Sequence, residues 1–312
     1  MKTLHIVVPC YNEEQVLPET NNQLLLLINE LIESRLIEPT SRIVYIDDGS
    51  KDSTWDLIRT FHSQNHSIRG IKLSRNKGHQ NALLAGLFES AQDADIVISL
   101  DADLQDDIHI IPEMICENQK GSEIVYAVRN NRDSDSIFKR NSALLFYKLM
   151  GFLGVDLISN HADYRLLSKR VILELEQYPE RNLFLRGLIP TLGFPSSKVY
   201  YRRNVRFAGQ TKYPFKKMIT FALEGLTSFS NKPLKLITTL GLLLFIISIG
   251  IIIYTLMRYF THQTVSGWAF LNISIWLLSG IQLLALGIVG EYISKIYIES
   301  KARPRYHIQE KI

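Results

Sequence analysis

The sequence has 312 residues, of which 46% are hydrophobic, and its formal net charge is +4. This charge is too small to indicate a nucleic-acid-binding protein, so no nucleic-acid partner is expected. The two cysteines, Cys10 and Cys116, suit a reduced cytosolic domain and exclude a disulfide-stabilised scaffold.

Short apolar runs alternate with amphipathic segments through the first half of the chain. This alternation predicts an α/β domain with a mostly parallel sheet and right-handed crossovers. A further strand, at the edge of the sheet, is expected at 197–205. The other predicted strands are 4–9, 42–47, 70–74, 96–100 and 123–128, and the predicted helices are about 15–36, 54–64 and 80–91.

Polar and mostly acidic residues follow the first, second and fourth of these strands. They are the segments 10–14, 47–50 and 101–107. Because ligands of open α/β sheets bind at the carboxyl ends of the strands, the three segments together predict a nucleotide site.

The segment after the fourth strand also has the ligand chemistry of a divalent cation site. Asp101 and Asp103 are two residues apart, so both side chains can leave the strand on the same side. Their carboxylates and the amide oxygen of Gln105 are hard oxygen ligands, which suit Mg²⁺ or Mn²⁺. The alternative is a solvated acidic turn that caps the next helix.

The C-terminal third contains two long apolar segments. Residues 236–257 and 266–290 carry no charge, and each is long enough for a membrane-spanning helix. The alternative is a hairpin buried in a protein core. Lysine and arginine flank the pair on its outer sides, which predicts that both termini are cytoplasmic. The preceding segment, 214–231, is amphipathic enough to lie in the membrane interface.

These motifs, in this order, resemble the family 2 glycosyltransferases of the GT-A fold. With the membrane segments, the chain is similar to polyisoprenyl-phosphate glycosyltransferases, including dolichol-phosphate mannose synthase and bacterial undecaprenyl-phosphate glucosyltransferases. The resemblance covers essentially the whole chain. It rests on Pro9-x-Tyr-Asn-Glu13, Asp47-Asp-Gly-Ser50, Arg75-Asn-x-Gly78 and Asp101-Ala-Asp-Leu-Gln-Asp106.

The resemblance implies a fold and four regions. Residues 1–213 would form a cytoplasmic, Rossmann-like GT-A domain, and 214–233 an interfacial helix. Residues 234–294 would form two transmembrane helices, and 295–312 a basic cytoplasmic tail. The protein would therefore be a multi-pass protein of the cell (inner or plasma) membrane, and its membrane helices would offer a surface for homo-oligomers.

The resemblance also implies roles for individual residues. Asp47 would accept a hydrogen bond from the uracil ring, and Asp48 would lie close to the nucleoside. Asp101 would lie near the ribose and the metal, and Asp103 and Gln105 would hold Mg²⁺ or Mn²⁺ on the diphosphate. The remaining residues of the nucleotide pocket would be Pro9, Tyr11, Asn12 and Glu13.

Basic residues and one further acid complete the implied site. Arg129 and Arg140 would contact donor and acceptor phosphates, with a solvated basic face as the alternative. A glycine-containing loop with Arg206 and Lys212 would close on the diphosphate, or would be a basic juxtamembrane stretch. Asp163 would be the acid nearest the acceptor, either as a base or as an orienting group.

The implied reaction is an inverting transfer of a sugar from a UDP-sugar, glucose or N-acetylglucosamine, to a polyisoprenyl phosphate in the lipid bilayer, for cell-envelope glycosylation. Two alternatives remain open. A processive polysaccharide synthase usually carries a Gln-x-x-Arg-Trp motif, and this sequence has none. A membrane-anchored protein that binds nucleotide sugars without turnover is the other.

Overall fold

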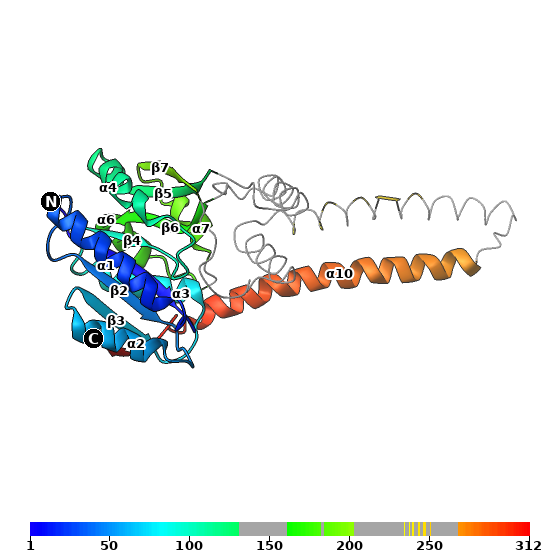
Figure 1. Cartoon of the computed structure of the whole chain (residues 1–312). Coiled ribbons are helices and arrows are strands. Elements are labelled where there is room, and N and C mark those ends of the chain that lie inside the picture. The colour runs from blue at the N-terminus through cyan, green and yellow to red at the C-terminus, as the bar shows by residue number, and fades with distance from the viewer. Residues whose placement is uncertain are drawn as a thin grey trace, which may run out of the picture.

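The computed structural model describes residues 1–130, 161–181, 184–202 and 268–312, with isolated positions between 234 and 250. Figure 1 shows a sheet domain from which a single labelled helix, α10, extends. The elements are β1 (Leu4–Cys10), α1 (Leu17–Glu33), β2 (Arg42–Asp47), α2 (Thr54–Gln64), β3 (Ile68–Leu73), α3 (His79–Ser90), β4 (Ile96–Ser99), a short 3₁₀ helix (Ile108–Ile110), α4 (Ile111–Gln119), β5 (Ile124–Arg129), β6 (His161–Ser168), α6 (Lys169–Glu176), α7 (Leu185–Thr191), β7 (Ser196–Tyr201), α10 (Trp268–Lys301) and β8 (Ile308–Lys311).

The described strands form one eight-stranded sheet in the order β7-β5-β6-β4-β1-β2-β3-β8. Strands β4, β1, β2 and β3 are parallel neighbours, whereas β6 is antiparallel to both β4 and β5. The chain adds β2 and β3 on one side of β1 and then crosses to place β4 on the other side. The strand order therefore reverses between β1 and β4, which is where α/β sheets bind ligands.

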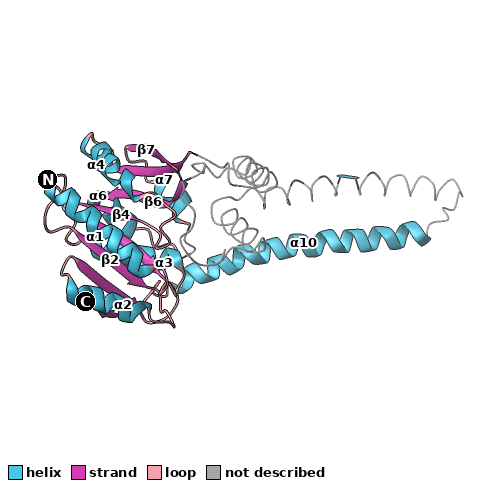
Figure 2. Cartoon of the chain, viewed as in Figure 1, coloured by secondary structure: helices cyan, strands magenta, loops and turns pink. Residues whose placement is uncertain are grey.

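Helices cover both faces of the sheet (Figure 2). One buried cluster joins the sheet to α1, α2 and α4, and the other joins it to α3, α6 and α7. Helix α3 lies very close to β1 and β2 at Gly86. A Cβ atom at this position would overlap Val7 Cγ1 and would lie 2.8 Å from Ile46 Cγ1. The glycine therefore allows the close approach that fixes the N-terminus of α3 at the carboxyl edge of the sheet.

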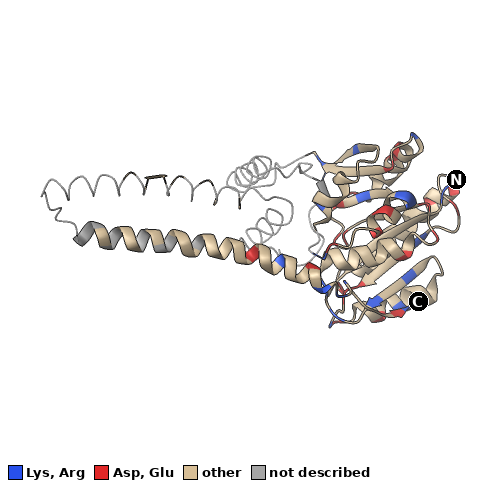
Figure 3. Cartoon of the chain, turned by 180° about the vertical axis from the view of Figure 1, so that it is seen from behind, with Lys and Arg blue, Asp and Glu red and all other residues tan. Residues whose placement is uncertain are grey.

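Helix α10 has 34 residues, and the part from Trp268 to Gly290 carries no charge. At 1.5 Å per residue that part is about 34 Å long, enough to cross a hydrocarbon layer of about 30 Å. By length and composition, the described residues include one candidate span, Ile281–Lys301, and none of its apolar window is buried. Figure 3 shows that the charged residues of α10 are in the part of the helix next to the sheet domain.

The C-terminal residues return to the sheet. Strand β8 pairs antiparallel with β3, and Glu310 accepts a hydrogen bond from Trp55 Nε1 at 3.2 Å and pairs with Arg59 at 3.2 Å. The segment 295–312, expected to be a basic tail, thus provides the last turns of α10 and the edge strand of the sheet.

The predicted α/β class and mostly parallel sheet are confirmed, and most predicted boundaries agree within about two residues. The sequence analysis missed β6 and β8, both antiparallel. The expected interfacial helix (214–233) and most of the first expected span (236–257) lie outside the described residues. Residues 268–290 of the second expected span lie within α10.

Candidate active site

The site is built where β1, β2 and β4 end. Several hydrogen bonds join the loop after β1 to the loop after β2, and three of them involve Asn12 and Glu13. Asn12 N donates to Ser50 Oγ (3.0 Å), Lys51 N donates to Asn12 Oδ1 (2.9 Å), and Glu13 N donates to Thr54 Oγ1 (2.9 Å). Asn12 has a φ of +53°, a conformation that asparagine tolerates well in turns. The structure therefore uses Asn12 to shape this loop.

The other predicted residues of the β1 end differ in exposure. Pro9 is buried in the strand, whereas the Tyr11 ring is 36% exposed at the surface of the loop. An exposed aromatic ring beside an acidic edge is available to a planar ligand. Glu13, two residues further along the same loop, is half-buried.

Asp47 and Asp48, at the end of β2, have different surroundings. Asp47 is fully buried, its Oδ1 accepts a hydrogen bond from Ser50 N (3.0 Å), and its Oδ2 has no partner among the described residues. A buried carboxylate oxygen without a donor is costly, so it fits a ligand that brings an N–H group.

Both oxygens of Asp48 are already used. They accept hydrogen bonds from Lys77 N (2.7 Å) and Gly78 N (2.9 Å), and so hold the turn before α3. Burial raises the pKa of Asp48, and these two donors offset part of that rise. Gly49, with a φ of +68°, lets this loop lie against the same turn.

The acidic loop after β4 is tightly folded. Gln105 N donates to Asp103 Oδ1 (3.2 Å), and Leu104 between them has a φ of +53°. Thr20 of α1 anchors the start of the loop by donating to Ala102 O (2.7 Å). Asp103 and Gln105 therefore lie on one turn, and their role as metal ligands stays a prediction.

The loop concentrates negative charge around Asp101. The pKa of Asp101 is raised to about 6, mainly by burial; His79 lowers this pKa, and the carboxylates of Asp106, Asp163 and Asp103 contribute to the rise. A divalent cation would relieve this repulsion, so the donor chemistry fits Mg²⁺ or Mn²⁺. Within the described residues no three His, Cys, Asp or Glu side chains form a ready-made cage. A site with so few protein ligands suits Mg²⁺, which usually binds one or two carboxylates and completes its coordination shell with water and substrate phosphate.

Arg129, the last residue of β5, holds this loop. Its Nη2 donates to Asp106 Oδ1 (3.1 Å) and its Nε to the Tyr201 hydroxyl (3.0 Å), while that hydroxyl donates to Asp106. The Asp106 side chain is 2% exposed. The structure thus places Arg129 in a buried ion pair; its predicted phosphate contact stays a prediction. Arg140, Arg206 and Lys212 lie outside the described residues.

Asp163 on β6 is surrounded by two arginines and a histidine. Arg165 donates to its Oδ1, Arg186 Nη2 lies 3.1 Å from its Oδ2, and His79 Nε2 lies 3.7 Å from the same oxygen. His79 Nε2 is also 3.6 Å from Asp101 Oδ1, so it connects the two acids. Burial alone would raise the pKa of Asp163, but Arg186 and Arg165 outweigh burial and hold the pKa well below its ordinary value. A carboxylate that is so hard to protonate orients its neighbours better than it removes protons.

Two family models match the chain. The model described as "Glycosyl transferase family 2" matches residues 5–175, and "GtrB C-terminal hairpin" matches residues 232–296. The chain belongs to glycosyltransferase family 2. The first match covers the loops described above, and the second covers the charge-free part of α10.

Relatives match over nearly the whole chain. The Bacillus subtilis protein named uncharacterized glycosyltransferase YkoT is 52% identical, covering 98% of this chain and 90% of its own length. The bactoprenol glucosyl transferase of Shigella phage SfX is 37% identical, covering 99% of both chains. Among solved structures, glucosyl-3-phosphoglycerate synthase from Mycobacterium tuberculosis, in complex with Mn²⁺, UDP and glucosyl-3-phosphoglycerate, is 16% identical with a TM-score of 0.45, covering 72% of this chain and 78% of that one.

The sequence analysis missed three residues of the site: His79, Arg165 and Arg186. Arg165 could have been found, because it lies two residues from Asp163 and therefore on the same face of a strand. His79 follows Gly78, whose turn was predicted, and it is the first residue of α3. No sequence pattern indicated Arg186, because only the packing of α7 brings it to Asp163.

Proposed function

We propose that this glycosyltransferase moves glucose from UDP-glucose to a polyisoprenyl phosphate, with inversion at the anomeric carbon. The observation that carries the proposal is the full-length similarity to relatives named bactoprenol glucosyl transferases, which are 37–38% identical over at least 97% of both chains. The site geometry supports the same reaction class. The residue proposed to recognise the base, Asp47, and those proposed to bind the diphosphate through a cation, Asp101 and Asp103, lie at the same edge of the sheet.

The donor would bind across the ends of β1, β2 and β4. Asp47 Oδ2 would accept the N–H of the uracil ring, and the exposed Tyr11 ring would lie beside the nucleoside. Asp101 and Asp103 would hold a divalent cation, with Gln105 of the same turn. When bound, that cation neutralises the diphosphate and stabilises it as a leaving group.

The acceptor needs positioning more than activation. A phosphate monoester, with a second pKa near 6, is already anionic at neutral pH. Asp163 would stay ionised and would hold the guanidinium groups of Arg165 and Arg186 in position. It would not remove a proton from the acceptor. An in-line attack by the lipid phosphate oxygen on the anomeric carbon would then invert the configuration.

The lipid acceptor requires a site that a membrane can reach. The match to the GtrB hairpin and the exposed, charge-free part of α10 support a hairpin that places the domain on the membrane. We place the catalytic domain and both termini on the cytoplasmic side, as the flanking lysines and arginines indicate. Self-association through the hairpin stays a prediction.

A panel of donors offered to the full-length protein tests the proposal. The protein is placed in liposomes that contain undecaprenyl phosphate, and UDP-glucose, UDP-N-acetylglucosamine and GDP-mannose are added separately. Mass spectrometry should detect a lipid-linked hexose with UDP-glucose, at a rate well above that for the other two. Lipid-linked product from GDP-mannose alone, or a growing polysaccharide, would exclude this assignment.

A further inference from the structure

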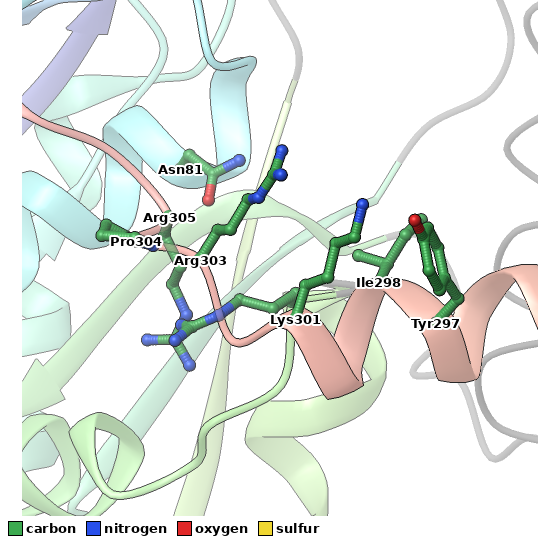
Figure 4. Close-up of a pocket in the computed structure, with 8 residues that line it drawn as sticks. Asn81, Tyr297, Ile298, Lys301, Arg303, Pro304 and Arg305 are labelled. Carbon is green, nitrogen blue, oxygen red and sulfur yellow. The ribbon is translucent and has the colours of Figure 1, made fainter.

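A second basic site lies at the junction between α10 and the sheet domain. A pocket of roughly 330 Å³ is lined by the cationic side chains Arg181, Lys301, Arg303 and Arg305, and by Asn81 and Tyr297 (Figure 4). None of these residues belongs to the site described above. The pocket opens at the end of the candidate span, whose last residue is Lys301.

Two of the arginines form the frame of the pocket. The backbone N–H of Arg181 donates to both carboxylate oxygens of Glu299 (2.8 Å each), and Arg181 Nη2 donates to Ala302 O (3.3 Å). Arg305 Nε donates to Glu180 O (3.2 Å), and its Nη2 donates to Tyr178 O. These contacts fix the chain that follows α10 against the loop before α7.

The other two cations are not paired with acids among the described residues. Lys301 Nζ lies 4.1 Å from the centroid of the Tyr297 ring, and Arg303 is exposed at the pocket wall. The carboxylates of Glu180 and Glu299 belong to the same junction, so the four cations leave an excess of two positive charges. An excess of charge that faces an open cavity favours an anionic ligand.

The direction of α10 brings this charge towards the membrane. Helical side chains lean towards the helix N-terminus, and the N-terminal part of α10 is the charge-free one. The Lys301 ammonium accordingly lies over Tyr297, one turn back along the helix. Tyr297 is seven residues, or about 10 Å, beyond Gly290, which is a few ångströms outside a headgroup layer of about 5–8 Å, and its side chain leans back towards that layer.

We propose that this pocket binds the phosphodiester headgroup of an anionic phospholipid, such as phosphatidylglycerol, where α10 leaves the membrane. The phosphate would lie between Lys301 and Arg303. The alkyl part of the headgroup would lie against Tyr297, whose ring suits the membrane interface. The site would fix the height and tilt of the catalytic domain above the lipid surface.

A bulk phospholipid fits this position better than the acceptor phosphate does. His79 faces Asp101 and Asp163, whereas Asn81 lines the pocket. Residues two apart on a helix point about 200° apart, so the first turn of α3 separates the two sites. A phosphate held in the pocket is therefore on the wrong side of α3 to attack the donor.

The test is a lipid titration of the full-length protein in neutral detergent, followed by native mass spectrometry. Two variants each lose two positive charges: Lys301→Gln/Arg303→Gln in the pocket, and Lys120→Gln/Arg170→Gln at the C-cap of α4 and on the surface of α6. The pocket variant should bind phosphatidylglycerol roughly tenfold to thirtyfold more weakly. The control variant should match the unaltered protein, and phosphatidylcholine should not distinguish the three.

The proposal would be overturned if phosphatidylglycerol affinity fell equally in both variants, or if it did not fall in the pocket variant. Weaker binding of undecaprenyl phosphate with unchanged phosphatidylglycerol binding would also overturn it, and would assign the pocket to the acceptor. UDP binding and transfer to a short, soluble prenyl phosphate should be normal in the pocket variant. That readout confirms folding and separates this proposal from the proposed transfer reaction.

Discussion

Asp47 and Asp48 show how adjacent carboxylates acquire separate functions. Asp47 keeps one buried oxygen unused by the described residues, whereas both oxygens of Asp48 hold the turn before α3. We expect Asp47→Asn to weaken UDP binding by roughly tenfold or more, the value of a hydrogen bond to a charged group. Asp48→Asn should instead lower the unfolding temperature, because its amide group would face a backbone N–H.

Isothermal calorimetry with UDP and a thermal unfolding scan distinguish these two outcomes. Since the proposed Asp47 contact is to a part of the donor that does not react, turnover at saturating donor should change less than affinity. Unchanged UDP affinity in Asp47→Asn would show that Asp47 does not read the base.

The acidic loop gives a second prediction at the residue scale. Asp103→Asn removes one anionic ligand, so transfer should fall roughly a hundredfold or more while the fold persists. Asp107→Asn is the matched control, because Asp107 lies on the same loop and its Oδ1 caps the short 3₁₀ helix by accepting from His109 N. Assays in Mg²⁺ and in excess chelator complete the test. Full activity of Asp103→Asn, or of the unaltered protein in chelator, contradicts the metal role.

At the scale of single elements, β1 carries a buried histidine far from the site. His5 is 1% exposed at the amino end of the strand, and neither ring nitrogen has a partner among the described residues. Burial, with help from Arg69, lowers its pKa to about 4. In the unfolded chain His5 is protonated below about pH 6.5, whereas in the folded protein it stays neutral down to about pH 4. The free energy of unfolding is therefore highest above pH 6.5 and decreases as the pH falls towards 4.

Between pH 6.5 and pH 4, the protonation of His5 in the unfolded chain lowers the free energy of unfolding by roughly 3 kcal/mol. We therefore expect the unfolding temperature of the protein to fall more steeply between pH 6.5 and 4 than that of His5→Leu. Parallel pH profiles for the two proteins would mean that His5 does not change its protonation on folding.

Strand β8 ties α10 to the sheet and gives another element-scale prediction. Removing residues 308–312 would delete the pairing with β3, the Glu310 contacts with Trp55 and Arg59, and the Lys311–Glu89 pair. We expect a lower unfolding temperature and faster proteolysis after Lys301. Glu310→Gln is the milder companion variant, since it keeps the backbone ladder. If the truncation leaves both measurements unchanged, β8 does not stabilise the domain.

The strands that could be predicted from sequence are those whose apolar runs end in turn residues. Parallel β1, β2 and β4 are buried on both faces, so Leu4–Cys10 and Ile96–Ser99 read as continuous apolar runs. Strand β6 carries Asp163 and Arg165 on one face, so its pattern resembled a functional loop. Strand β8 has four residues, too few for a periodic signal. The cationic cluster around Asp163 depends on contacts between distant segments, which no local pattern contains.

At the scale of the whole molecule, we propose that the sheet domain carries out the transfer and that α10 holds this domain at the membrane. The nucleotide edge lies at the strand reversal between β1 and β4, and the charge-bearing end of α10 joins the domain beside α3. The acceptor's phosphate is fixed at the membrane surface by its tail. The central claim is therefore that this chain couples a cytoplasmic donor to a lipid phosphate.

The most direct measurement follows UDP release and lipid-linked glucose together, with the full-length protein in liposomes with and without undecaprenyl phosphate. We expect UDP to be released from UDP-glucose only when the lipid phosphate is present, with one UDP for each glucosyl lipid and an inverted configuration at the anomeric carbon. UDP release that is independent of the lipid, or a glucosyl product that retains the donor configuration, would contradict it.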